Sequence, residues 1–91
     1  MSEGFNDISR PIHYAGNGEV ECMDALESMM SVAPAWMSAE TAYWWGCVFK
    51  YLWRWPHKNR MKDLLKARQC FQYLIKSVRK DFAEDGEGEQ E

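Results

Sequence analysis

The sequence predicts an all-α fold of three helices, on the evidence of its hydrophobic spacing and its helix boundary residues. Apolar residues recur every three or four positions in two stretches, which is the spacing of a helix with one buried face, and a third stretch between them is apolar on all sides, as in a buried helix. No run alternates apolar and polar residues as a half-exposed strand would. We therefore expect helices at 19–31, 39–55 and 60–82, between an N-terminal arm of residues 1–18 and an acidic tail of residues 83–91.

The N-terminal arm is expected to be extended or looped. Pro11, Gly16 and Gly18 interrupt it, together with several polar residues that favour turns. His13 and Tyr14 could cover a bound ligand, with the histidine as a hydrogen-bond donor or proton carrier. A pair of this kind in a loop is, however, more often a packing or turn element.

The first expected helix, 19–31, is amphipathic. Its acids lie towards the helix start, where negative charge favours the helix dipole. The apolar positions that recur at intervals of three and four are Val20, Met23, Leu26, Met29 and Met30.

The second expected helix, 39–55, has a clear start and a clear end. Ser38 is a good N-cap, and Pro56 stops the helix because it lacks a donor and disfavours helical geometry in the preceding residue. From Ala42 to Trp55 apolar and aromatic residues fall on all sides of the helix. That pattern indicates burial in a core or in a subunit interface.

The third expected helix, 60–82, combines an apolar stripe with strong positive charge. Ten of the eleven basic residues lie between positions 50 and 80, where Asp63 is the one acid. The tail that follows is rich in Glu and Gly, a composition that predicts disorder. The stripe consists of Met61, Leu64, Leu65, Phe71, Leu74, Ile75 and Val78.

The size and composition of the chain favour a small protein that assembles with itself. With 91 residues, 14% of them aromatic, it carries more apolar bulk than one small domain hides easily, so we expect a homo-oligomer. Cys22, Cys47 and Cys70 are odd in number and widely spaced, which indicates buried, reduced thiols in a cytosolic protein. We expect no signal segment, no membrane span and a cytoplasmic location.

A row of residues in the second helix is the main candidate for an anion site. Gly46, Lys50 and Arg54 are four apart and share one side of the helix, and His57 or Lys58 would continue the row. Arginine binds phosphate bidentately and lysine acts as a point charge, while neighbouring aromatic residues could stack on a base. Alternatively, both cations extend from an interface to solvent or pair with acids.

Asp63 has two interpretations. It could orient Arg54 or Lys50 within the site, or it could complement the dipole in the first turn of the third helix. Phosphate-binding loops, dinucleotide fingerprints and zinc spacings are absent from the sequence, so binding chemistry is better represented than catalysis and no metal site is expected.

The order and spacing of several short motifs resemble a family of small tailed-phage proteins, often labelled nucleotide kinase-like and otherwise a domain of unknown function. The resemblance covers residues 11 to 76. It implies a phage origin, the cytoplasm of an infected bacterial host, a connection to nucleotides, and a site that includes His13, Tyr14, Lys50, Arg54 and Lys58. The motifs are His13-Tyr14, Glu21-Cys22-Met23-Asp24, Gly46 with Lys50-Tyr51-Leu52 and Arg54, Lys58, Asp63-Leu64-Leu65-Lys66-Ala67, and Tyr73-Leu74.

The leading functional hypothesis is a phage accessory protein that binds a nucleotide or a nucleotide-derived, possibly cyclic, anion between subunits and so sequesters a host immune signal. One alternative is a nucleoside-monophosphate kinase without a phosphate loop, which would need Mg²⁺; no other cofactor is expected. Another is a module that contacts a host protein or nucleic acid, although the acidic tail would compete with nucleic acid for the basic surface. The expected ligand-binding residues are His13, Tyr14, Lys50, Tyr51, Arg54, Lys58 and Asp63.

Overall fold

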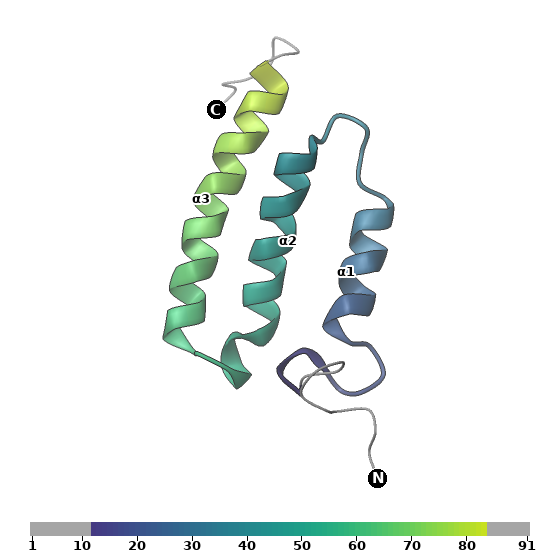
Figure 1. The fold of residues 1–91 in the computed structure, drawn as a ribbon, viewed down its shortest axis with the longest axis vertical. Helices are drawn as coiled ribbons and strands as arrows, with labels where there is room; N and C mark the ends of the chain where they lie inside the picture. The colour runs from purple at the N-terminus through teal and green to yellow at the C-terminus, as the bar shows by residue number, and fades with distance from the viewer. Residues whose placement is uncertain (1–11, 84–91) are drawn as a thin grey trace.

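Three α-helices lie side by side in chain order in the computed structural model, which describes residues 12–83 (Figure 1). They are α1 (Cys22–Ser31), α2 (Ala39–Arg54) and α3 (Met61–Ala83). Short 3₁₀ turns, η2 (Ile12–Tyr14) and η3 (Trp55–His57), precede α1 and follow α2. The three predicted helices are confirmed, and residues 12–83 contain no strand. The predictions for residues 1–11 of the arm and 84–91 of the tail lie outside the described residues.

The first helix begins three residues later than predicted, at Cys22 rather than at residue 19. The side-chain oxygen of Asn17 accepts hydrogen bonds from the backbone N–H groups of Glu19, at 2.9 Å, and Val20, at 3.2 Å. These bonds hold the chain in a turn in place of a first helical turn. Glu21 then serves as the N-cap, and its N–H donates to Asp24 Oδ2 over 3.3 Å.

The second helix begins at its predicted N-cap. Ser38 Oγ accepts a hydrogen bond from the backbone N–H of Thr41 over 3.2 Å. Its end is one residue short of the prediction, because Trp55 enters the 3₁₀ turn that contains Pro56. Gly46 faces α1, since an added Cβ would lie 3.4 Å from Met30 Cε.

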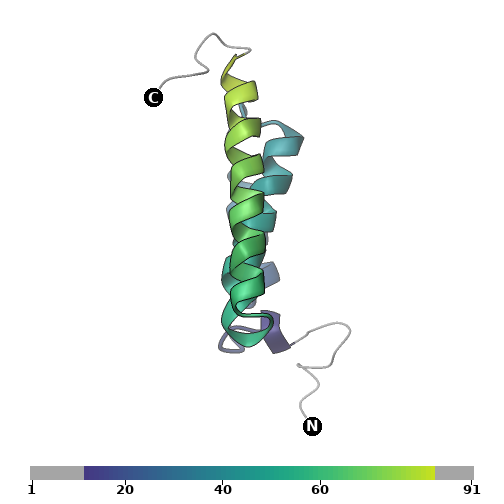
Figure 2. The same cartoon turned by 90° about the vertical axis from the view of Figure 1, so that its left-hand side faces the viewer.

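The three helices form a single layer with α2 in the middle (Figure 1). Figure 2 looks along this layer, with α3 in front and the other helices behind it. In the described residues the buried apolar side chains are the small Ala15, Cys22 and Ala67. Cys47 and Cys70 are half-buried rather than buried, and all three cysteines are free thiols. The interior is therefore thin, and polar contacts near the two ends of α2 add to the apolar contacts that join it to α3.

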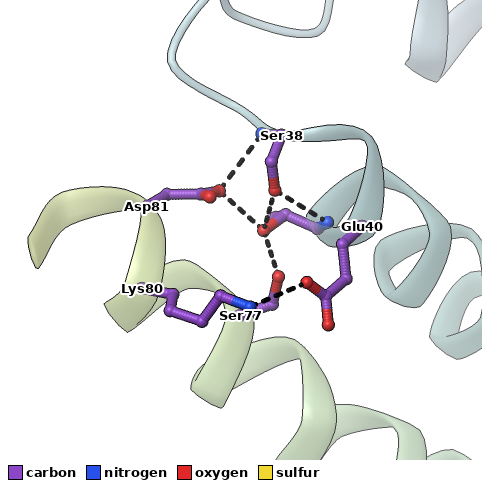
Figure 3. Close-up of polar contacts among 6 residues, drawn as sticks. Ser38, Glu40, Ser77, Lys80 and Asp81 are labelled. Atoms are coloured by element: carbon purple, nitrogen blue, oxygen red, sulfur yellow. Dashed lines mark hydrogen bonds and ion pairs between the residues drawn. The ribbon is translucent and has the colours of Figure 1, made fainter. Parts of the chain in front are cut away.

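One of these polar contacts joins the start of α2 to the end of α3 (Figure 3). The Thr41 hydroxyl donates its proton to Asp81 Oδ2 over 2.6 Å. The Ser77 hydroxyl lies 2.6 Å from the same Thr41 oxygen, and Ser77 is the donor in this contact because the Thr41 proton is already used. Asp81 Oδ2 also accepts the backbone N–H of Ser38 over 3.2 Å. Thr41 is fully buried, so these bonds take the place of the hydrogen bonds that its hydroxyl would make to water in the unfolded chain.

None of the helices between residues 12 and 83 combines the length and the apolar character that a bilayer crossing requires.

Candidate functional site

The candidate site is built around the Arg54 side chain at the end of α2. Arg54 Nε and Nη2 donate to the two carboxylate oxygens of Asp63, each over 3.1 Å. Arg54 Nη1 donates to the Tyr14 hydroxyl over 2.8 Å. The Tyr14 proton remains available for donation, because its oxygen is the acceptor in this contact. We call these three residues the Arg54 network; it ties the N-terminal turn, α2 and α3 together.

Asp63 is ionised within this network despite complete burial. Burial alone would raise the pKa of its carboxyl group, but the hydrogen bonds from Arg54 and Asn59 outweigh it and lower the pKa to about 2. Asn59 contributes its backbone N–H over 3.3 Å and its side-chain amide over 3.2 Å. A buried, fully hydrogen-bonded ion pair of this kind is rigid, so it positions neighbouring groups.

A basic hollow lies on one side of the Arg54 network, with a volume of about 640 Å³. Among residues 12–83, no carboxylate lines it. Lys58 and Arg60 border it from the turn that links η3 to α3, where Arg60 adopts a left-handed backbone with φ of 50°. The lining residues are Ile12, His13, Gly16, Trp53, Pro56, His57, Lys58 and Arg60.

The charges around the hollow act on His13. Burial, then Lys58 and Arg54, lower the pKa of the His13 imidazole below its usual value, and Asp63 opposes them. His13 is therefore mostly neutral at pH 7, with one ring nitrogen able to donate and the other able to accept. Its ring lies 4.4 Å from that of Tyr14, centroid to centroid.

Gly16 shapes the wall of the hollow. Its backbone has φ of 61°, and an added Cβ would lie 2.9 Å from Trp53 Cζ2 and in severe overlap with the carbonyl oxygen of Val20. Glycine therefore allows the Trp53 ring to lie against the N-terminal turn, where its ring also borders the hollow.

An apolar pocket of about 480 Å³, with Tyr14 in its lining, lies between α1 and α2. Lys50 is the one charged residue in its lining. The lining residues are Tyr14, Cys22, Met23, Leu26, Met30, Ala42, Tyr43, Gly46, Cys47 and Lys50.

Cations gather around the ring of Tyr51. Arg54 Cζ and Lys50 Nζ each lie 4.8 Å from its centroid, and Lys66 Nζ lies 5.8 Å away. The negative face of the ring offsets part of their mutual repulsion. Tyr51 therefore organises the positive charge of this surface, in addition to any contact with a ligand.

The structure divides the predicted site residues into three groups. Tyr14, Arg54 and Asp63 meet in the Arg54 network. His13 and Lys58 line the basic hollow. Lys50 borders the apolar pocket and shares Tyr51 with Arg54, so the predicted row of cations does not face a single cavity.

Two residues of this region were missing from the sequence-based site. Asn59 stands four residues before Asp63, a spacing that can signal local side-chain hydrogen bonding. Arg60 reaches the hollow through a left-handed turn, for which the sequence gives no clear signal because such geometry usually marks glycine or asparagine. Among residues 12–83 no group of three or more His, Cys, Asp and Glu side chains is placed to hold a metal ion.

The fold and the site together define a small all-helical protein with a buried Arg–Asp ion pair bonded to Tyr14, a basic hollow and an apolar pocket. The chain belongs to the DUF3310 family, described as proteins of unknown function, whose model matches residues 8–72. No curated protein and no solved structure matches the chain. The family description names no activity, so the link to nucleotides and to phages stays a prediction.

Proposed function

We propose that this protein binds a nucleotide or nucleotide-derived anion, with the phosphate in the basic hollow. The observation that carries the proposal is the lining of that hollow: two histidines, Lys58 and Arg60, with no carboxylate among the lining residues that the structure describes. Its volume of about 640 Å³ lies within the range of small-molecule sites. Phosphate oxygens are strong acceptors, and they suit a site that offers charged and neutral donors together.

Lys58 and Arg60 contact the phosphate in this proposal, and Arg54 positions them. Three N–H groups of Arg54 already donate to Asp63 and Tyr14, so its charge is largely neutralised. The same ion pair anchors the start of α3, directly after the turn that carries Lys58 and Arg60.

The base stacks on Trp53, the aromatic ring in the lining. Stacking on an aromatic side chain tolerates any base, since every base has a π face. His13 adds a hydrogen bond rather than a full charge, because its pKa is lowered. The resulting site favours the phosphate strongly and the base weakly, which suits sequestration of a cyclic or small signalling nucleotide.

The phage setting, the infected host cytoplasm and the sequestration of an immune signal belong to the same proposal. They rest on the resemblance of motifs such as His13-Tyr14 and Lys50-Tyr51-Leu52 to small phage proteins. A nucleoside-monophosphate kinase and a host-protein module are alternative outcomes of the experiments below.

The test is isothermal titration calorimetry with nucleoside mono-, di- and triphosphates, cyclic mono- and dinucleotides, and inorganic phosphate. We expect one class to bind, and Lys58→Ala or Arg60→Ala to weaken it at least about 10-fold, the value of one charge-assisted hydrogen bond. The matched control is Lys76→Ala, about 22 Å along α3 from Met61, which should leave the affinity unchanged. Absence of binding to the whole panel would refute the proposal.

A second assay separates binding from catalysis. Incubation with Mg²⁺, a nucleoside triphosphate and a monophosphate should leave both nucleotides intact if the protein only binds. Production of a diphosphate that depends on Lys58 would instead establish the kinase.

A further inference from the structure

Large apolar side chains of this protein remain open to solvent in the part of the chain that the structure describes. Leu52 is 51% exposed and Phe71 is 50% exposed, whereas the buried apolar side chains there are all small. Because the three helices form one layer, the described residues supply no second layer to cover either side (Figure 2). Helices with apolar faces are stable when another layer buries them.

The most apolar of these surfaces lies over α2 and α3, and we call it the Leu52–Phe71 face. It contains a groove of about 360 Å³ between the two helices, in whose lining Arg68 is the one charged residue. Ile75, one turn after Phe71 and 38% exposed, extends the face along α3. The groove is lined by Val48, Leu52, Leu64, Ala67, Arg68 and Phe71.

The opposite side of the layer has a different character. Tyr43 and Leu52 are nine residues apart, about two and a half helical turns, so they point to opposite sides of α2. The Tyr43 side carries the cations that gather around Tyr51 and the mouth of the apolar pocket. Two copies meeting through that side would bring like charges together at a cost.

The groove of the Leu52–Phe71 face carries less of this penalty. Arg68, the one cation among its described lining residues, has a long apolar stem that can pack while its head reaches water, and arginine is enriched in protein interfaces. Charge therefore favours self-association through this face over self-association through the Tyr43 side.

The dimensions of the face also suit a dimer. The 23 residues of α3 give it a length of about 34 Å, and two neighbouring helices a width of about 20 Å. Because α2 has only 16 residues and a length of about 24 Å, the resulting area is about 600 Å², at the lower end of the roughly 600–1,000 Å² that each partner buries in a stable interface.

We propose that the Leu52–Phe71 face is the interface between two copies of this chain, related by a two-fold axis. Phe71 of each copy enters the groove between α2 and α3 of the other, which turns two single layers into one two-layer bundle. This inference does not depend on the proposed nucleotide site, which lies at the end of the layer around η3.

The experiment is sedimentation velocity of the purified full chain, without nucleotide, over a wide range of protein concentration. We expect a dimer, and we expect Phe71→Glu to weaken it at least about 10-fold, since it replaces the apolar ring by a carboxylate that must lose its water, a cost that the neighbouring Arg68 offsets only in part. The matched control Tyr43→Glu places the same charge on the opposite side, at a residue 62% exposed, and should leave dimerisation within about 3-fold of the unchanged chain.

Circular dichroism of each variant shows whether it is folded. If Phe71→Glu loses its helical signal, the milder Leu52→Ala decides, with an expected weakening of about 10-fold. A chain that is monomeric at every concentration would overturn the proposal. So would a dimer that survives the folded face variants, or one that Tyr43→Glu dissociates while Phe71→Glu does not.

Discussion

Removal of the Arg54 guanidinium should expose the energetic role of the buried ion pair. Arg54→Met keeps a long side chain but removes the two hydrogen bonds to Asp63, each of 3.1 Å, and the 2.8 Å bond to Tyr14. The Asp63 carboxylate, which has no exposed surface, then keeps donors from Asn59 alone. Breaking a buried pair in this way costs about 3–5 kcal/mol of unfolding free energy.

The cost should depend on pH in a defined direction. In the unchanged protein the pKa of Asp63 falls from 3.8 to about 2 on folding, so its stabilising contribution is present above pH 3.8 and is lost as the pH falls towards 2. In Arg54→Met, burial dominates and raises the pKa of Asp63 above its unfolded value. Protonation then relieves the unpaired charge, so the destabilisation should shrink as the pH falls from 7 towards 4.

Urea unfolding followed by tryptophan fluorescence at several pH values measures this difference. The matched control is Lys80→Met, which breaks the exposed 3.2 Å pair with Glu40 and should cost less than about 1 kcal/mol. If Arg54→Met does not fold, Tyr14→Phe removes one bond of the network and should cost about 1 kcal/mol. An Arg54→Met variant as stable as the control, or one whose cost is independent of pH, would contradict the argument.

Three further predictions concern Thr41, Gly16 and the His13 imidazole. Thr41→Val should cost about 2–3 kcal/mol in urea unfolding, because it leaves the Asp81 carboxylate short of its hydroxyl donor, and it should raise the lowered pKa of Asp81 in an NMR titration. Gly16→Ala should lower the free energy of unfolding by more than about 1 kcal/mol, since φ is 61° and the new Cβ would overlap Val20. In the control Gly46→Ala, the new Cβ meets its nearest neighbour at 3.4 Å, so the free energy of unfolding should change by less than about 1 kcal/mol. The His13 imidazole should titrate by NMR below the ordinary 6.5, because burial and the cations near it disfavour its charged form.

The helices were predictable because their signals are local. Ser38 as an N-cap, Pro56 as a stop and the three-to-four spacing of apolar residues all act within a few residues of where they stand. The start of α1 was wrong because Asn17 bonds to the two N–H groups that a first turn would have contained, a competition that spacing of apolar residues does not reveal.

The site was predictable only where charge alone decides the pairing. Asp63 is the one acid in a basic segment, which made Arg54 one of its candidate partners, and the two residues do form an ion pair. The separation of Lys50 from Lys58 could not be inferred, because Lys58 lies past the end of α2 and η3 and does not continue the helical row to which Lys50 belongs. The bond between Thr41 and Asp81 spans 40 residues and depends on how α2 packs on α3, which no local pattern shows.

The two polar networks also divide the molecule into parts that open separately. Arg54 with Asp63 at one end, and Thr41 with Asp81 at the other, fasten α2 and α3 into one hairpin. The ten-residue α1 is much shorter and packs along its length on apolar contacts near Gly46. Its amide hydrogens should therefore exchange with solvent through a local opening that leaves the hairpin intact. The opening and closing of α1 over the apolar pocket should then be an equilibrium separate from global unfolding. A molecule bound between Tyr14 and Lys50 would shift this equilibrium towards the closed form without changing the rest of the fold.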